Sequence, residues 1–141
     1  MKILITGIKQ GLGRYLARKF MEQDSDNKII GLDHIDENHL DKEGTDILDS
    51  YYKVDLSDIP ASMSIIEQII QQNNDIDLVI NNAGLKTYDR LINLSQEKII
   101  DTYSVNTIMP VVINRLFLSF FEPVLELLLF SRVQILVLKY H

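Results

Sequence analysis

The chain has 141 residues, a formal net charge of −6 at pH 7, 46% apolar residues and no cysteine. The length and apolar content favour one domain with one well-filled core. The negative charge argues against a nucleic-acid partner, which requires clustered Lys and Arg. The lack of cysteine excludes disulfides and thiolate metal sites and allows a reducing cytoplasm, which we expect as the location.

The sequence predicts neither a secretory signal nor a membrane span. Its N-terminus runs directly into a predicted strand, without the basic and apolar regions of a signal peptide. The most apolar stretch, residues 111–138, is too interrupted to cross a membrane, so we expect no membrane partner. The interrupting residues are Asn114, Arg115, Glu122, Pro123, Glu126 and Arg132.

The first strand and helix are predicted within the first 24 residues. KILIT (2–6) is a β-branched apolar run that ends at Gly7, which is typical of a buried strand. Apolar side chains then recur at helical spacing and predict an amphipathic helix to about residue 24. Its apolar face consists of Leu12, Leu16 and Phe20.

A second strand and an acidic segment follow. KIIGLD (28–33) predicts a strand, and the seven acidic residues against one lysine in 33–49 predict a solvated loop with at most a helical turn. Two histidines of this segment, with two of its acids, could be drawn as metal ligands. Nothing apolar fixes their geometry, so we predict no metal site at His34, Asp36, His39 and Asp41.

Residues 51–80 repeat the pattern of strand, helix and strand. YYKVDL (51–56) and IDLVI (76–80) predict the third and fourth strands. Pro60 suits the first turn of the helix between them, where its missing N–H costs little. The apolar face of that helix is Met63, Ile66, Ile69 and Ile70.

A long helix is predicted over residues 96–121, and RVQILVL (132–138) predicts a fifth strand. Ser95 is a suitable N-cap with Glu97 in the first turn, and Pro110 should bend the helix or remove one hydrogen bond. The residues expected on one side of this helix are Ile99, Tyr103, Ile113, Phe117 and Phe120.

Strands that alternate with helices at this spacing predict right-handed βαβ units. The expected fold class is therefore α/β, with three α/β/α layers around a parallel sheet that stops after about five strands.

Three glycines between the first strand and the first helix suggest a phosphate site. Gly7, Gly11 and Gly13 would allow the tight turn, the approach of a pyrophosphate and close packing of the helix on the sheet, with helix N-terminal amides facing the charge. A Walker A loop is excluded because no Gly-Lys-Ser/Thr follows. Asp33, twenty residues after Gly13, could accept both hydroxyls of an adenosine ribose.

Four segments together resemble the short-chain dehydrogenase/reductase family. TGIKQGLG (6–13) looks like its TGxxxGxG signature, Asp55-Leu56 its adenine contact, NNAG (81–84) its motif of the same letters, and YSVNTIMP (103–110) its VNxxxP segment. The resemblance covers residues 1 to about 115, and residues 122–141 are atypical. It implies a single NAD(P)-binding Rossmann-like domain over residues 1–141.

The resemblance implies roles for individual positions. Asn106 would kink its helix and hold a water of the family's catalytic proton relay, and Asn81 would tie its strand to its neighbours. The cofactor residues would be Gly7, Gly11, Leu12 and Gly13 at the pyrophosphate, Asp33 at the adenosine ribose, Asp55 and Leu56 at the adenine, and Asn82, Ala83 and Gly84 near the cofactor's ribose.

The sequence favours NAD over NADP as the cofactor. The Asp33 carboxylate would repel a 2′-phosphate, and neither Gln10, before the second glycine, nor His34 is a strong base that would attract one. Lys9 leaves some room for NADP.

The family's catalytic Ser, Tyr and Lys are not found where the resemblance places them. The family reaction is hydride transfer between a nicotinamide and a small carbonyl or alcohol substrate, with a Tyr whose pKa is lowered by a Lys four residues later. Ser131 precedes the fifth predicted strand instead of following it, and Tyr140 has no residue four places on. YLARK (15–19) has the Tyr-x-x-x-Lys spacing, but it lies on the pyrophosphate side and is predicted not to be catalytic.

Two functions therefore stay open. One is an NAD(P)-dependent oxidoreductase in a truncated or frameshifted form; the other is a catalytically inactive dinucleotide-binding or interaction module. The wide apolar stripe of helix 96–121, which resembles the family's dimerisation helix, predicts a homo-oligomer.

Overall fold

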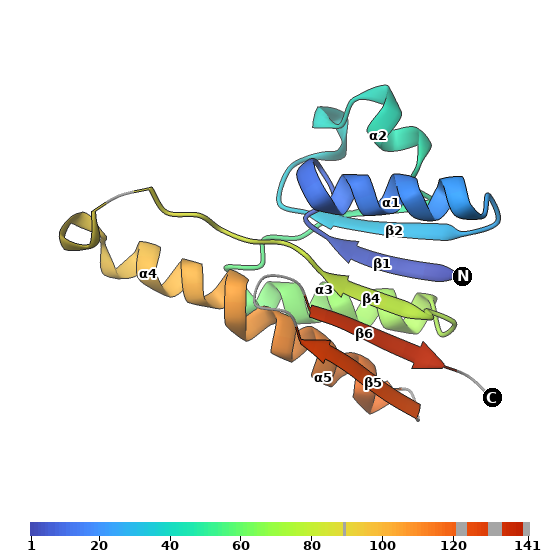
Figure 1. The fold of residues 1–141 in the computed structure, drawn as a ribbon. Coiled ribbons are helices and arrows are strands. Elements are labelled where there is room, and N and C mark those ends of the chain that lie inside the picture. Colours follow the sequence, from blue (N-terminus) through green and yellow to red (C-terminus); the bar gives the residue numbers. More distant parts are fainter. Residues whose placement is uncertain (89, 121–123, 130–133, 140–141) are drawn as a thin grey trace.

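The computed structural model describes residues 1–88, 90–120, 124–129 and 134–139. Within these residues one sheet has the strand order β3-β2-β1-β4-β6-β5 (Figure 1). Four neighbouring strands run parallel, as predicted. They are β1 (Lys2–Thr6), β2 (Lys28–Asp33), β3 (Ser50–Lys53) and β4 (Leu78–Asn81).

The helices follow the predicted alternation with the strands. The acidic segment contains two short helices. The long predicted helix consists of two α-helices with a π-helical turn between them. The bounds are α1 (Gly11–Gln23), η1 (Glu37–His39), α2 (Lys42–Asp46), α3 (Ile59–Gln72), η2 (Leu91–Asn93), α4 (Gln96–Tyr103), the π-helical η3 (Ser104–Ile108) and α5 (Met109–Phe120).

Helices cover both faces of the parallel sheet, which confirms the three-layer prediction (Figure 1). Alternate side chains of a strand point to opposite faces, so Ile3 and Ile5 pack in the core with α1 while Leu4 packs in the core with α3 and α5. All three side chains are fully buried. Because the four strands run parallel, their carboxyl ends share one edge of the sheet.

The other end of the sheet differs from the prediction. The fifth predicted strand is β6 (Gln134–Lys139), but it pairs antiparallel with β4, and a further strand, β5 (Val124–Leu129), pairs antiparallel with β6. Residues 132 and 133 lie outside the described residues. β5 and β6 pair antiparallel because only four residues separate them. A parallel neighbour would need a crossover of about a dozen residues or more.

The buried face of α1 matches the predicted one at Leu16 and Phe20, which pack against the core, and differs from it at Leu12. Gly13 and Ala17 are buried, whereas Leu12 is 49% exposed. At Gly13, α1 lies so close to Gly7 and Asn82 that no side chain fits there, while the neighbouring Leu12 lies at the surface.

The long predicted helix has two environments. In α5, Ile113 and Phe117 are fully buried against α3 and the sheet, but Phe120 is 52% exposed. In α4, Ile99 and Tyr103 are exposed because this helix extends beyond the carboxyl ends of the strands (Figure 1). The apolar stripe predicted on one side is therefore a core contact only in α5. Ser95 is the N-cap of α4, as predicted, and accepts from the Lys98 amide at 3.2 Å.

The two phenylalanines of α5 provide a matched test of this core. Phe117→Ala should lower the free energy of unfolding by about 3–5 kcal/mol, because it leaves a cavity in the core. Phe120→Ala, the same chemical change at an exposed position, should change it by at most about 0.5 kcal/mol. Urea denaturation followed by circular dichroism measures both, and equal losses would contradict the described position of α5.

Candidate functional site

A groove of about 530 Å³ lies at the shared carboxyl edge of the parallel strands. In open α/β sheets, ligands bind at this edge, where the connections from neighbouring strands diverge to opposite faces. Eight of the ten predicted cofactor positions line the groove: Gly7, Gly11, Asp33, Asp55, Leu56, Asn82, Ala83 and Gly84. The structure thus brings together residues from four separate segments of the sequence.

The turn after β1 depends on its glycines. Gly7 and Gly11 have φ angles of 71° and 63°, which side-chain-bearing residues rarely adopt. A Cβ on Gly13 would lie 2.6 Å from Asn82 Nδ2 and would also overlap the carbonyl oxygen of Gly7. Gly13 is therefore a packing residue, which explains why it does not line the groove. A Cβ on Gly11 would face open space, so the backbone at this position is accessible from the groove side.

Thr6 connects the glycine turn to the segment after β4. Its hydroxyl oxygen accepts from the backbone amides of Asn82 and Ala83, both at 3.0 Å, and its side chain is buried. Asn82 Nδ2 in turn donates to the carbonyl oxygens of Thr6 at 3.1 Å and Gly7 at 3.0 Å. These bonds fix two neighbouring loops that line the groove.

Asp33 lies at the end of β2 with its carboxylate in the groove. Oδ2 accepts from the Lys9 amide at 2.9 Å, and Oδ1 accepts from the His34 amide at 2.9 Å. His34 Nδ1 also lies 2.9 Å from Oδ1, while the Asp33 side chain is only 8% exposed. An ionised carboxylate has about four acceptor positions, so these contacts orient Asp33 and leave it capacity for a ligand's hydroxyl groups.

Asp55 and Leu56 follow β3 on the next part of the groove wall. Asp55 Oδ1 accepts from the Ser57 hydroxyl at 2.7 Å and from the Ser57 amide at 3.0 Å. These two bonds lower the pKa of the Asp55 carboxyl below its ordinary value. Leu56 is buried beneath the groove, so Asp55 is an ionised acceptor above an apolar base.

The two asparagines outside the groove lining bind other parts of the fold. Asn81 Nδ2 donates to Asn114 Oδ1 of α5 at 2.8 Å, so Asn81 connects its strand to a helix. Asn106 lies in the π-helical turn η3, and π-helical turns are frequent at functional sites. Its side-chain amide accepts from the Leu85 amide at 2.7 Å and donates to the Leu85 carbonyl at 2.9 Å. Asn106 therefore holds the backbone directly after Gly84.

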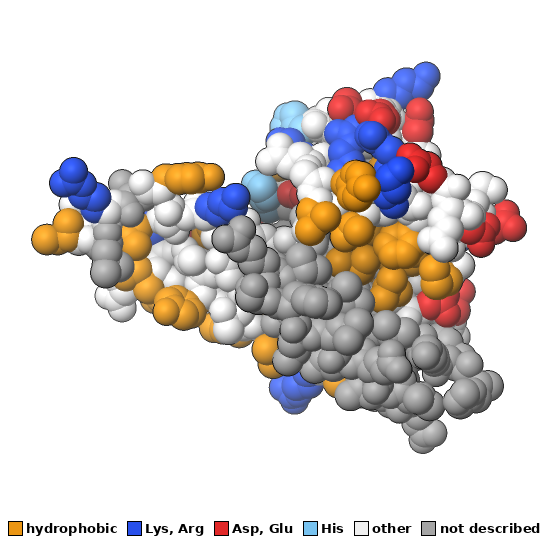
Figure 2. Space-filling model, viewed as in Figure 1, with side chains coloured by type: hydrophobic (Ala, Val, Ile, Leu, Met, Phe, Trp, Pro, Cys, Tyr) orange, Lys and Arg blue, Asp and Glu red, His pale blue; other side chains and the backbone are white. Residues whose placement is uncertain are grey.

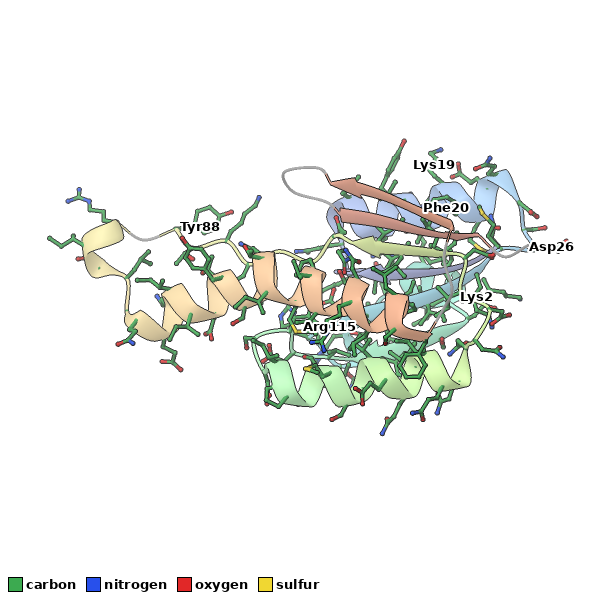
Figure 3. The ribbon with its side chains drawn as sticks, turned by 90° about the horizontal axis from the view of Figure 1, so that it is seen from below. Lys2, Lys19, Phe20, Asp26, Tyr88 and Arg115 are labelled. Atoms are coloured by element: carbon green, nitrogen blue, oxygen red, sulfur yellow. The ribbon has the colours of Figure 1, made fainter. Side chains whose placement is uncertain are left out.

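The YLARK pair lies away from the groove. Tyr15 is exposed, and Lys19 Nζ, 5.7 Å from the Tyr15 ring centroid, is paired with Glu22. Figure 3 shows Lys19 at the end of the molecule opposite Tyr88. Neither Tyr15 nor Lys19 lines the groove. Leu12, a predicted cofactor residue, also does not line it and is instead exposed at the start of α1.

The acidic segment is more ordered than the solvated loop we expected. Asp41 pairs with Arg14 of α1, and Asp36 pairs with Lys53 of β3 at 2.9 Å. The two acids considered above as ligands thus have separate partners, and His34 Nδ1 lies against Asp33. Within the described ranges, no three His, Asp or Glu side chains are close enough to share a metal ion. No described helix is long and apolar enough to cross a bilayer.

Sequence reasoning did not assign roles to Thr6 or Leu85, and it considered Lys9 only for the charge of its side chain. Thr6 stands inside the glycine signature, so its position could have been noticed, but a side chain that binds two distant amides has no local pattern. Lys9 and Leu85 act through backbone groups, which residue identity does not reveal.

The family model that describes "short chain dehydrogenase" matches residues 1–123 of this chain. The chain belongs to the short-chain dehydrogenase family. It is 24% identical over 105 residues to "3-oxoacyl-[acyl-carrier-protein] reductase FabG" of Chlamydia pneumoniae, and this match covers 68% of the chain and 40% of the relative.

Solved structures show the same fold. A 4-hydroxyisoleucine dehydrogenase in complex with NADH is 25% identical, with a TM-score of 0.72 over 84% of this chain and 48% of that protein. A short-chain dehydrogenase from Sphingobium yanoikuyae in complex with NADPH is 21% identical, with a TM-score of 0.71 over 82% of this chain and 46% of that protein. The chain thus spans less than half the length of each of these three proteins.

Thr6 offers a direct test of how the groove is held together. Thr6→Val keeps the shape of the side chain but leaves the amides of Asn82 and Ala83 without their acceptor, so the chain should lose about 2 kcal/mol or more of unfolding free energy. Thr6→Ser keeps the hydroxyl and should lose less. Chemical denaturation of both variants checks this, and a serine variant as unstable as the valine variant would contradict the role of the hydroxyl.

Proposed function

We propose that the chain is one NAD-binding domain of an oxidoreductase of short-chain type, which transfers hydride between a nicotinamide and a small carbonyl or alcohol substrate. The observation that carries this proposal is the groove, where the glycine turn, the Asp33 carboxylate and residues 82–84 converge at the carboxyl edge of the parallel sheet. The two cofactor complexes among the structural neighbours, with NADH and with NADPH, support a nicotinamide dinucleotide.

The start of α1 fits a pyrophosphate. Its N-cap residue Gln10 makes no side-chain capping bond, whereas Asp58 caps α3 and Ser95 caps α4. The first amides of a helix need partners from outside the helix, and a phosphate provides them together with a favourable interaction with the helix dipole. The open space beside Gly11 would admit the phosphate to these amides.

The strand ends beside this turn fit the adenosine part of a dinucleotide. Asp33 would accept the two ribose hydroxyls, and Asp55 with the Leu56 amide would contact the adenine. A 2′-phosphate would meet a negative field here. Its source is the Asp33 carboxylate, which lines the groove and whose side chain is only 8% exposed. This charge supports NAD over NADP.

The other end of the groove would receive the nicotinamide ribose, with Asn82, Ala83 and Gly84 along it. Asn106 holds Leu85 by both backbone groups, and its amide retains one further donor and acceptor. We propose that Asn106 positions a water there for the proton relay. A bound nicotinamide would supply the hydride donor or acceptor.

Oligomerisation through residues 96–121 also belongs to the proposal. Ile99, Ile100 and Tyr103 are exposed on α4, which extends beyond the sheet (Figure 1). A second copy would cover this apolar surface.

Calorimetric titration with NADH and NADPH tests the cofactor. The chain should bind NADH more tightly than NADPH, and Asp33→Asn should weaken NADH binding about tenfold or more, because hydrogen bonds to a charged acceptor are lost. Asp26→Asn, at the far end of the molecule (Figure 3), removes the same charge and should leave binding unchanged. Binding of neither nucleotide would contradict the proposal, and NADPH preference would contradict the role of Asp33. Binding without turnover on a panel of carbonyls would favour the inactive module.

A further inference from the structure

Arg14, the residue after the last glycine of the turn, is held by the acidic segment. Its guanidinium pairs with Asp41 through both terminal nitrogens, with Nη1 3.1 Å from Oδ2, and Nη2 lies 3.6 Å from Glu43 Oε2. The Arg14 side chain is only 17% exposed. Figure 2 shows the basic and acidic side chains interleaved over α1 and α2.

The partner side of this contact is itself fixed. Asp41 is the N-cap of α2, and its Oδ1 accepts from the Gly44 amide at 2.8 Å. Gly44 is buried, and a Cβ there would lie 3.4 Å from Arg14 Nη2. Glu43 also pairs with Arg18, one turn further along α1. The Arg14 guanidinium is thus held between α1 and α2 by carboxylates that are themselves fixed in place.

This contact lies beside the ribose end of the groove. Arg14 Nη1 is 3.5 Å from the Lys9 carbonyl oxygen, and the Lys9 amide donates to Asp33. One residue therefore separates the guanidinium from the carboxylate that would hold the ribose. An arginine in such a place can bind a phosphate through two parallel hydrogen bonds.

We propose that Asp41 and Glu43 are positioning residues that hold Arg14 away from the ribose and thereby set the preference for NAD over NADP. This inference rests on the proposed function. The two carboxylates neutralise Arg14 and occupy both of its terminal nitrogens, so a 2′-phosphate finds the Asp33 carboxylate without a compensating cation. Without its partners, Arg14 would be free to pair with the phosphate.

The test is the ratio of NADPH to NADH affinity in the double variant Asp41→Asn with Glu43→Gln. Asparagine is as good an N-cap as aspartate, so α2 keeps its cap while Arg14 loses both charged partners. NADPH affinity should rise about tenfold, since hydrogen bonds between charged groups are gained, and NADH affinity should change less than about twofold. Adding Arg14→Gln should abolish the gain, and Asp41→Asn alone should give a smaller gain.

A matched control separates this mechanism from a general change in charge. Glu37→Gln with Asp46→Asn removes two carboxylates from the same segment, and neither is a partner of Arg14. A control that gains as much NADPH affinity, or a double variant with an unchanged ratio, would overturn the inference while the proposed function stands. A parent chain that binds neither nucleotide would overturn both. Thermal melts verify that each variant is folded.

Discussion

The groove depends on one contact between backbones, where α1 packs against the turn after β1. Gly13 leaves no room for a side chain between the helix, the Gly7 carbonyl and the Asn82 amide. This contact brings the N-terminus of α1 to the carboxyl edge of the sheet, and Asn82 locks it by donating to Thr6 and Gly7. The amides at the helix start and the acceptors at the neighbouring strand ends therefore face one shared space.

Charged side chains lie in two regions, inside the groove and in the acidic segment beside it. Inside the groove, Asp33 and Asp55 are oriented by hydrogen bonds, mainly from backbone amides and from Ser57, so they are ready acceptors for neutral hydroxyl and amino groups. Outside it, the acidic segment takes up the cations of the neighbouring elements, Arg14 above all. The same segment that looks like a solvated loop in the sequence thus decides which charges are available to a ligand.

Much of the fold and of the groove could be predicted from the sequence, because the parallel strands and the glycine turn depend on short stretches of residues. The bounds of β1 and β2 followed from apolar runs, and Gly7, Gly11 and Asp33 from glycine spacing and a strand end. The other five groove positions followed only from the resemblance to the family. The antiparallel β5 and β6 did not, because strand direction depends on the connection and not on composition. The roles of Thr6 and Arg14 were also not predictable, since each depends on partners about 25 or more residues away. Leu12 was assigned to the wrong place because helical spacing does not show how closely a helix approaches its sheet.

The most direct test of the account is an amide chemical-shift map of the isotopically labelled chain during titration with NAD. The account predicts shifts concentrated at residues 7–13, at Asp33 and His34, and at residues 82–85, with none at Tyr15, Lys19 or Asp26. Shifts centred on residues 86–101, or an unchanged spectrum at saturating nucleotide, would contradict the assignment of the groove as the dinucleotide site.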